Sequence, residues 1–351
     1  QNMSIANDTR HAGITIALDC MGGDYGPVET VAGAKLALEQ YKGSKELKIL
    51  LVGDINDINT YVGDSEQSGL AIVQSEGKII DDEHPVEGLR RKPNSSIVVT
   101  TKLVKSGAAD AAVSMGSTGA SMAASVMILG LLPGLDRPCI GGPFLGLAPN
   151  TVLMDMGSNI DCRPNLLLSF AMIGSVFSEK FLGIDHPRVG LLSVGSEPAK
   201  GNKQVQDSYK LFQSSPVNFV GNVEGMDFFT GKADVIVCDG FVGNILLKFA
   251  EGMGSVLRRY TQSQLSKMLP GDEAGELGEK LWTETNLARS IGGPLFGVKA
   301  PVVVGHGSAM AEEVAGAIAT ALKLVELDVQ SDLERSLVEL ASHQETGAGL
   351  E

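Results

Sequence analysis

Apolar runs with the length and composition of buried β-strands alternate along this chain with segments of helical character. The first run, Ile14–Asp19 (ITIALD), is rich in β-branched residues, and Leu47–Gly53 (LKILLVG) follows after a helix-like segment. Because most of these runs are continuously apolar, the strands are expected to be buried on both faces. The alternation therefore predicts an α/β fold in which helices cover both faces of a mostly parallel sheet.

The remaining elements can be placed from the same pattern. Further strands are expected at Ala71–Gln74, Asp110–Ser114, Thr151–Met156, Arg188–Val194, Val217–Val220, Asp234–Cys238 and Pro301–Val304. Helices are expected at Val28–Gln40, Ile97–Ser106, Ala120–Leu132, Asn165–Leu182, Val205–Gln213, Ile245–Tyr260, Ala309–Leu327 and Ser331–Ala341. Asp54, Asn244 and Ser308 are expected to cap the helices that follow them, as is Asn94 or Ser95 before Ile97.

The rest of the chain is expected to connect or flank these elements. Ile80–Pro93 is polar and is expected to be irregular, and the Pro- and Gly-rich segment Leu131–Pro149 is expected to cross between two halves. Residues 13–343 are expected to form a single α/β domain, with flexible tails at 1–12 and 344–351.

The charge balance argues against one class of partner. The 351 residues carry a formal net charge of −14, so the chain is not expected to bind nucleic acid. An acidic partner would need a local basic patch, and Arg90–Lys92 (RRK) is the densest one. A solvated surface is the alternative interpretation of these three side chains.

Cysteine and histidine usage predicts neither a metal site nor a disulfide framework. The four cysteines lack CxxC spacing and are expected to be reduced, mostly buried thiols of a cytosolic protein. The five histidines show no metal-ligand spacing. The N-terminal segment has no apolar signal-peptide core, and the longest apolar run noted, around Val126–Leu132, is too short to span a bilayer.

Polar, glycine-containing signatures follow six of the expected strands. They are DCMGGD (19–24), SMGSTGA (114–120), DMGSNID (155–161), VGSEPAKGN (194–202), DGFVGN (239–244) and GHGS (305–308). In parallel sheets, ligands bind at the carboxyl ends of the strands. Six such ends at one edge of the sheet would build a polar, glycine-lined cleft, although each aspartate taken singly is better explained as a cap or turn residue.

The stretch Val113–Ala124 (VSMGSTGASMAA) is the best candidate anion site. Gly116 and Gly119 allow a sharp turn and close approach of the backbone, and Ser114, Ser117 and Thr118 add hydroxyl donors. A helix start adds free N–H groups and a partial positive charge. This stretch lacks the Walker sequence and the GxGxxG pattern, so a tight structural connection is the alternative.

Few side chains are suited to acid–base chemistry. His306 follows a buried strand and precedes a helix start, which makes it the best single acid or hydrogen-bond donor. Lys200 and Lys248 each lie in or just after a Gly/Asn turn and could neutralise a phosphate. The absence of a GxSxG elbow disfavours a serine hydrolase.

At this level of detail the chain resembles a known family, the phosphate acyltransferases of bacterial phospholipid synthesis. The resemblance covers Ile14 to about Leu327 and rests on these motifs: DCMGGDYGP, RRKPNSS, SMGSTGA, DRP, MDMGSNIDCRP, GLLSVGSEPAKGN, GNVEGMD, DVIVCDGFVGNILLK and GGPLFGVKAPVVVGHGSA. The chain departs from the family pattern at Ser117, where the family has Asn, at Ser158, where it has Ala, and at Ala309–Ala311, where it has polar residues.

The resemblance implies a fold and a reaction. The implied fold is a Rossmann-like three-layer α/β/α sandwich related to phosphate acetyltransferase and isopropylmalate dehydrogenase-like folds. The implied reaction converts fatty acyl-ACP (acyl carrier protein) and inorganic phosphate to acyl phosphate and ACP, without a cofactor. The family is homodimeric and cytoplasmic, with peripheral membrane association, and its product feeds a membrane glycerol-3-phosphate acyltransferase.

Phosphate is already a competent nucleophile, so the site's work would be to hold it against the thioester and stabilise the oxyanion. The catalytic candidates are His306, Asn159, Lys200 and Asn244. The substrate-binding candidates are Asp19, Gly22, Gly23, Asp24, Asn94, Ser95, Ser114, Gly116, Ser117, Thr118, Gly119, Asp155, Asn202, Asp239 and Gly243. Arg90, Arg91 and Lys92 are the candidates for docking acidic ACP.

Two alternative functions remain, and the role of one helix surface is undecided. A CoA-dependent phosphate acyltransferase would differ in its acyl carrier, and a non-catalytic scaffold would bind ACP or acyl chains without turnover. The helix from Ile245 carries apolar residues at near-helical spacing through Met268, with Arg258, Arg259 and Lys267 among them. It is expected to be a dimer face or packed core, with an interfacial membrane contact as the alternative.

Overall fold

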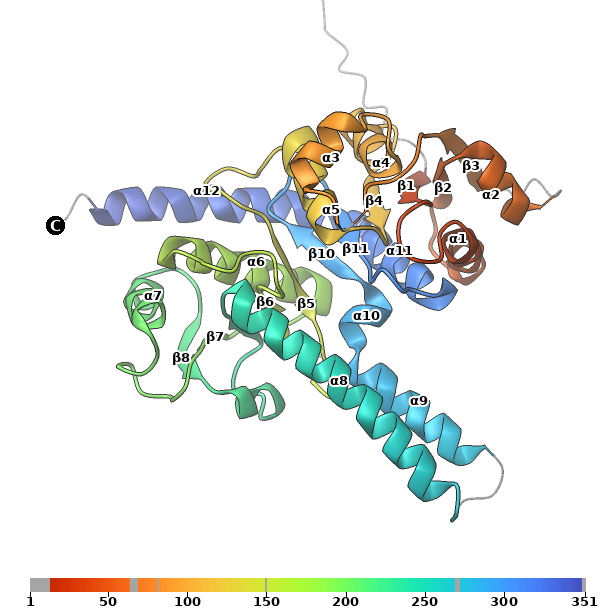
Figure 1. Ribbon diagram of the computed structural model, residues 1–351. Coiled ribbons are helices and arrows are strands. Elements are labelled where there is room, and N and C mark those ends of the chain that lie inside the picture. Colours follow the sequence, from red (N-terminus) through yellow and green to blue (C-terminus); the bar gives the residue numbers. More distant parts are fainter. Residues whose placement is uncertain (1–12, 64–68, 81, 149, 269–271, 349–351) are drawn as a thin grey trace, which may run out of the picture.

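A single twisted sheet runs through the whole molecule. The computed structural model describes residues 13–63, 69–80, 82–148, 150–268 and 272–348 (Figure 1). The sheet has eleven strands in the order β3-β2-β1-β4-β11-β10-β5-β6-β9-β7-β8. In that order their bounds are Leu70–Gln74, Glu46–Gly53, Gly13–Asp19, Ala111–Ser114, Val302–Val304, Gly293–Phe296, Cys139–Pro143, Val152–Met154, Val235–Val237, Val189–Leu192 and Phe219–Val223.

Helices cover both faces of this sheet, as the apolar strands predicted. Alternate residues of one strand lie in different buried clusters: Ile16 and Leu18 belong to the cluster that contains Val31 and Val314, whereas Ala17 belongs to the cluster that contains Val104. The helices are α1 (Val28–Gln40), α2 (Ile55–Val62), α3 (Pro85–Arg91), α4 (Ser96–Lys105), α5 (Thr118–Ala124), η1 (Ser125–Leu129), α6 (Pro164–Leu182), α7 (Lys203–Gln213), η2 (Gly225–Phe229), α8 (Gly240–Leu265), α9 (Glu273–Thr285), α10 (Leu287–Ile291), α11 (Ala311–Glu326) and α12 (Val329–Ala348). The three-layer α/β/α architecture is thus confirmed.

The two halves of the sheet run in opposite directions. Strands β3, β2, β1, β4 and β11 are parallel to one another, and so are β6, β9, β7 and β8. Between them, β10 is antiparallel to β11 and β5, and β5 is antiparallel to β6. The expectation that all polar strand ends share one edge is therefore wrong, because β5 and β10 reverse the strand direction between the halves.

The stagger of β5 and β10 brings the carboxyl ends of the central strands together. Val304, at the end of β11, pairs with Gly293, and two residues further along β10 Leu295 pairs with Ile140 of β5. The N–H of Met156, just beyond β6, donates to the Ile140 carbonyl at 2.8 Å. The ends of β11 and β6 therefore face each other across the middle of the sheet, while those of β7 and β8 lie farther away in strand order.

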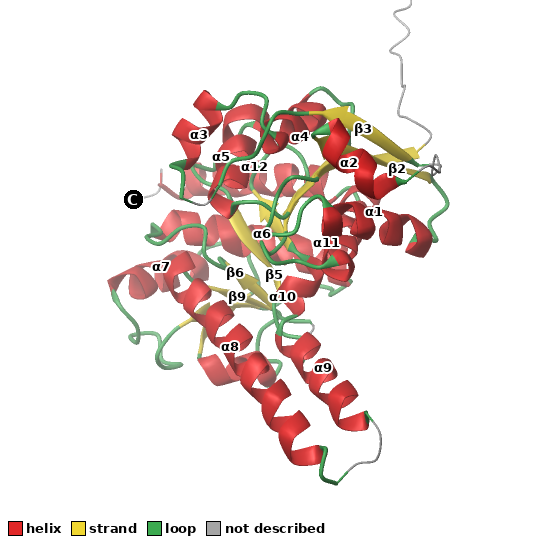
Figure 2. Cartoon of the chain, turned by 45° about the vertical axis from the view of Figure 1, so that its right-hand side comes forward, coloured by secondary structure: helices red, strands yellow, loops and turns green. Residues whose placement is uncertain are grey.

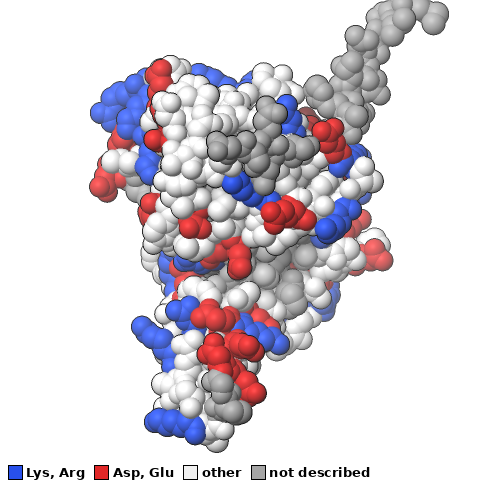
Figure 3. Space-filling view, turned by 90° about the vertical axis from the view of Figure 1, so that its right-hand side faces the viewer, with Lys and Arg blue, Asp and Glu red and all other residues white. Residues whose placement is uncertain are grey.

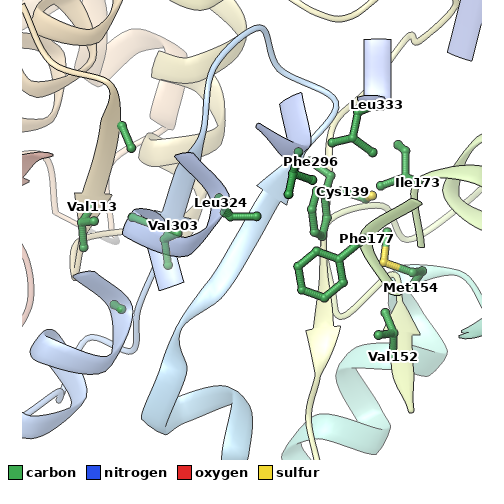
Figure 4. Packing of buried hydrophobic residues seen from close by; sticks show 14 of the residues in the cluster. Val113, Cys139, Val152, Met154, Ile173, Phe177, Phe296, Val303, Leu324 and Leu333 are labelled. Atoms are coloured by element: carbon green, nitrogen blue, oxygen red, sulfur yellow. The ribbon is translucent and has the colours of Figure 1, made fainter. Parts of the chain in front are cut away.

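One hydrophobic core joins the two halves beneath this junction (Figure 4). Phe177 of α6 makes an edge-to-face contact with Phe296 of β10 at a centroid distance of 5.1 Å, and both side chains are nearly fully buried. The same cluster extends from Val113 and Val303 on one side to Val152 and Met154 on the other. Because one core serves both halves, the cleft above it has a fixed floor.

Several expected elements need correction. The segments expected to be irregular or crossing contain α3 and β5, and β10 and α9 had no sequence prediction. The expected cap Asn244 lies within α8, which begins four residues earlier at Gly240 after the cap Asp239, and α11 begins at Ala311, beyond Ser308. Residues 344–348 belong to α12 rather than to a tail, and the expected tail at 1–12 lies outside the described residues.

A helical hairpin formed by α8 and α9 projects from the body of the molecule (Figures 1 and 2). In the space-filling view it forms the lower extension, with acidic and basic side chains interspersed over it (Figure 3). Among the described helices, only α6 has the length and composition to cross a membrane, and more than half of that segment is buried in the core.

Candidate functional site

A cleft of about 570 Å³ lies where the two halves of the sheet meet. The ends of β4 and β11 line one side with Gly116, Ser117 and His306, and Gly157 and the first turns of α8 line the other. Of the sequence candidates, the lining includes Gly23, Asp24, Gly116, Ser117, Thr118, Asn244, Lys248 and His306. The antiparallel junction therefore brings together residues from distant parts of the sequence.

Asp19 organises the loops of the first half without lining the cleft. Its buried carboxylate accepts the N–H groups of Met21 and Gly22 at 3.2 and 3.1 Å, and the hydroxyl of Ser114 at 2.8 Å. Burial raises the pKa of Asp19, opposed by these hydrogen bonds. The Ser114 hydroxyl accepts the Gly116 N–H at 3.0 Å in turn, so Asp19 and Ser114 shape the anion loop from below.

Asp155 performs the same task for the second half. Its carboxylate accepts the backbone N–H groups of Gly157, Ser158 and Asn159 at 2.8–3.0 Å, together with the Asn159 side-chain amide at 2.8 Å. Burial again raises the pKa of this group. The Asn159 amide also donates to the Pro138 carbonyl at 2.8 Å, so Asn159 is occupied in the loop rather than free to act on substrate.

Glycines allow the closest backbone approaches around the cleft. A Cβ at Gly22 would lie 2.6 Å from the Gly116 nitrogen, and one at Gly243 would lie 1.7 Å from the Asp155 carbonyl oxygen. Any side chain at these positions would push the strand-end loops apart. Gly22 and Gly243 thus bring the loops together but do not line the cleft.

The loop entering α5 retains part of its expected anion-binding capacity. The hydroxyl of Ser117 caps α5 by accepting the Ala120 N–H at 3.5 Å, which leaves its O–H able to donate. Thr118 is exposed at the first turn, where backbone N–H groups have no intrahelical acceptor. Gly119 packs against α3, because a Cβ there would lie 2.9 Å from Pro85.

His306 presents its ring to the cleft as a neutral donor. The N–H of Ser308 donates to His306 Nδ1 at 3.2 Å, and the Ser308 hydroxyl lies 3.0 Å from the same nitrogen. An Nδ1 that accepts an N–H must carry its lone pair, so the ring proton is on Nε2. Burial, together with the positive charges of Arg289 and Lys248, lowers the pKa of His306, which is therefore neutral at pH 7.

The charged lining of the cleft favours an anionic ligand. Lys78, Lys248 and Arg289 face it against two carboxylates, Asp24 and Glu251, and Glu251 pairs with Lys248 at 2.8 Å. The side chains that line the cleft thus carry one more positive than negative charge in an otherwise acidic protein, and Arg289 is also paired with Glu313 of α11. Lys78 and Arg289 were not among the sequence candidates, although Lys78 follows β3 in the glycine-containing segment QSEGK.

Apolar side chains occupy the rest of the lining. Ile79 and Ile80 follow Lys78, while Ile140, Met156 and Leu247 come from β5, the β6 end and α8. The cleft therefore places a cationic, donor-rich region beside a surface that can contact an aliphatic chain.

Other candidates lie outside the cleft lining and have structural roles. Asn202 and Asp239 cap α7 and α8 by accepting the N–H groups of Val205 and Val242, each at 2.9 Å. Lys200 is exposed near the β7 end, which the strand order places away from the junction. Asn94 pairs its backbone carbonyl with the Glu76 N–H, and Ser95 is buried at the start of α4.

The basic cluster Arg90–Lys92 lies at the end of α3. Lys92 is tied inward by an ion pair with Glu83 and by donation to the Lys78 carbonyl at 3.0 Å. Arg90 and Arg91 are exposed, and Arg91 Nη2 lies 3.7 Å from the Glu83 carboxylate. α3 packs against α5 through Pro85 and Gly119, and the two exposed arginines lie at the other end of α3.

No cluster of His, Cys, Asp and Glu in the described part of the chain has the arrangement of a metal site. All four cysteines are buried, as expected, and burial raises the pKa of each thiol.

Comparison with known proteins identifies the family. A family described as "Fatty acid synthesis protein" matches residues 14–332. The chain belongs to this family. A relative named phosphate acyltransferase from Pelotomaculum thermopropionicum is 43% identical over 327 residues, covering 92% of this chain and 94% of the relative.

Solved structures with the same fold come from another acyl-transferring group. A phosphotransacetylase from Streptococcus pyogenes is 20% identical, with a TM-score of 0.58, and covers 90% of this chain and 94% of its own. A branched-chain phosphotransacylase from Enterococcus faecalis V583 gives the same TM-score at 19% identity, covering 89% and 99%. These likenesses confirm the expected relation to phosphate acetyltransferase folds.

The tautomer and pKa of His306 can be tested directly. We expect side-chain ¹⁵N NMR to show an Nε2–H imidazole at pH 7 that titrates below pH 6.5, because protonation would place a second charge in a half-buried site facing Arg289 and Lys248. Glu251 and Glu313 oppose this shift without reversing it. The His306→Gln variant assigns the signal. A titration midpoint above 6.5, or a ring protonated at Nδ1, would contradict the assignment.

Proposed function

We propose that the cleft transfers a fatty acyl group from the thioester of acyl-ACP to inorganic phosphate. Family membership across residues 14–332 supports an acyltransferase that uses phosphate. The observation that carries the proposal is the lining itself, in which Lys78, Lys248 and Arg289 stand beside an apolar surface. The two substrates need these two environments, a dianion on one side and an aliphatic chain on the other.

The proposed reaction needs no activated side-chain nucleophile. A phosphate oxygen attacks the thioester carbonyl carbon, the new C–O bond forms, and the C–S bond breaks to release the ACP thiolate, which takes up a proton. The donors around Gly116–Thr118 and the ammonium groups of Lys78 and Lys248 would hold the phosphate in position. Arg289 is already held by Glu313 and Ser308. His306, as a neutral Nε2–H donor, would stabilise the negative charge that develops on the carbonyl oxygen.

Asn244 and Lys248 would complete the site from the opposite side. Both lie on the first turns of α8 and line the cleft across from His306. Asn244 is close to the loop that Asp155 organises, since a Cβ on Gly157 would lie 3.2 Å from its side chain. We assign Asn244 to substrate positioning and Lys248 to charge balance.

The function can be tested by incubating the purified full chain with palmitoyl-ACP and phosphate, then trapping acyl phosphate with hydroxylamine. Product that requires phosphate and forms from ACP but much less from palmitoyl-CoA supports the proposal. Product from CoA alone would assign a CoA-dependent phosphate acyltransferase instead. If neither carrier gives product, a non-catalytic scaffold becomes the better interpretation. Reactions without phosphate control for direct attack of hydroxylamine on the thioester.

ACP is proposed to dock beside α3. Arg90 and Arg91 are exposed there, and their charges would attract an acidic carrier to this surface. Lys92 is already paired with Glu83, so it would support the α3 region more than it would contact ACP.

We expect Arg90→Ala with Arg91→Ala to raise the KM for acyl-ACP by about five-fold, through weaker electrostatic encounter, and to leave the KM for phosphate unchanged. Steady-state kinetics at low and moderate salt would measure both constants. Lys203→Ala with Lys210→Ala, on α7 in the other half, is the matched control for loss of two positive charges. Equal KM values in all three proteins would contradict the docking assignment.

A homodimer is proposed through one face of α8. Phe241, Ile245, Phe249, Val256 and Tyr260 follow helical spacing, and each exposes more than half of its surface. Exposed apolar stripes of this size usually mark an interaction surface. Peripheral membrane association of a cytoplasmic enzyme is the alternative use of the stripe, and it would bring the product to a membrane glycerol-3-phosphate acyltransferase.

We expect Phe249→Glu to convert a dimer to a monomer in light scattering, because a charge would be buried at the centre of the interface. Phe229→Glu, equally exposed but located in η2, is the control. If the wild-type chain is monomeric and floats with anionic lipid vesicles while Phe249→Glu does not, the membrane assignment replaces the dimer. A monomer that does not float would remove both assignments.

A further inference from the structure

Arg289 lies between the base of the hairpin and the cleft. It belongs to the short helix α10, directly after α9, and its side chain is about one-fifth exposed. Its Nη2 donates to the Ser308 carbonyl at 2.9 Å and to the Ser308 hydroxyl at 3.0 Å. Its Nε pairs with Glu313 of α11. The guanidinium fork is thus committed to two partners that fix its plane.

Ser308 transmits this constraint to His306. Its N–H donates to His306 Nδ1 and its hydroxyl lies within hydrogen-bond distance of the same atom. Arg289 donates to the carbonyl and hydroxyl of the same Ser308, and the Ala309 N–H closes the turn by donating to the His306 carbonyl at 3.0 Å. The tautomer of His306 therefore depends on a turn that Arg289 holds in place.

The hairpin contacts Arg289 through Trp282 of α9, the single tryptophan of the chain. The guanidinium carbon of Arg289 lies 5.9 Å from the centroid of the Trp282 ring, and that of Arg258, on α8, lies 5.4 Å from it. Arg258 pairs with Glu279 at 3.3 Å, and among the described residues it is Arg289, not Arg258, that donates to Ser308. Trp282 thus lies beside two arginines, of which Arg289 lines the cleft and Arg258 does not.

We infer that Arg289 is a positioning residue for acyl transfer, which through Ser308 holds His306 as an Nε2–H donor facing the cleft. The expected change in kcat rests on the proposed function, whereas the tautomer of His306 can be measured without turnover. A purely electrostatic role for Arg289 would be satisfied by any cation. Positioning needs the planar fork, because a lysine ammonium cannot hold Glu313 and both oxygens of Ser308 in the same geometry.

The test compares Arg289→Lys and Arg289→Met with the wild-type chain. We expect both variants to lower kcat by about 100-fold, since a misplaced catalytic group costs that much, with less than about a three-fold change in the KM for phosphate. Their His306 signals in ¹⁵N NMR should show a mixture of tautomers. Arg258→Met, which removes the other arginine from Trp282, should alter tryptophan fluorescence without changing kcat or the tautomer.

The Ser308→Ala variant distinguishes a loss of positioning from misfolding of the arginine variants. It keeps the backbone groups and removes only the hydroxyl, so we expect about a five-fold loss in kcat and a urea unfolding midpoint near that of the wild type. Full kcat in Arg289→Lys, or an unchanged His306 tautomer in Arg289→Met, would overturn the inference. An inactive wild-type chain whose tautomer still shifts in Arg289→Met would instead overturn the proposed function.

Discussion

Two short antiparallel strands decide where this protein can do chemistry. Without β5 and β10, the parallel strands on either side could continue in one direction and place their polar ends along a single edge. The reversal turns the ends of β6 toward those of β4 and β11, so loops from the two halves face each other across a cleft. Because Phe177 and Phe296 pack beneath the reversal, the same residues that stabilise the fold also fix the separation of the facing loops.

Buried carboxylates give the two sides of the cleft a common construction. Asp19 and Asp155 are each removed from water, at a cost that shows in their raised pKa values, and each is surrounded by donors from the loop it follows. A carboxylate that accepts several backbone N–H groups fixes the course of that backbone more firmly than a neutral side chain would. Sequence reasoning assigned both aspartates to substrate. The structure shows that their charge is compensated within the loops, so the groups left for the substrate come from the next residues along the chain.

Much of the fold could be predicted because burial on both faces leaves a plain signal in the sequence. The apolar strands β1, β2 and β4 and the cap Asp54 follow from local chemistry. The strands β5 (CIGGP) and β10 (GPLF) could not be predicted, because they are short, contain Pro and Gly, and are formed by partners distant in sequence. The site was predicted only in part for the same reason. His306, Ser117 and Thr118 follow predicted strands on one side of the junction, whereas Lys78 and Arg289 reach the cleft through tertiary packing.

The length of α8 has a mechanical consequence. Its 26 residues form a rod of about 39 Å, which is held tightly near one end, where Gly243 contacts the Asp155 carbonyl. If the rod pivots there, a displacement of about 4 Å at Leu265 corresponds to a movement of about 1 Å at Lys248, only five residues from the pivot. A pivoting helix would therefore convert a large displacement of Leu265 into a small one beside the cleft. A contact that immobilises the tip would narrow the range of positions open to Asn244 and Lys248 without touching either side chain.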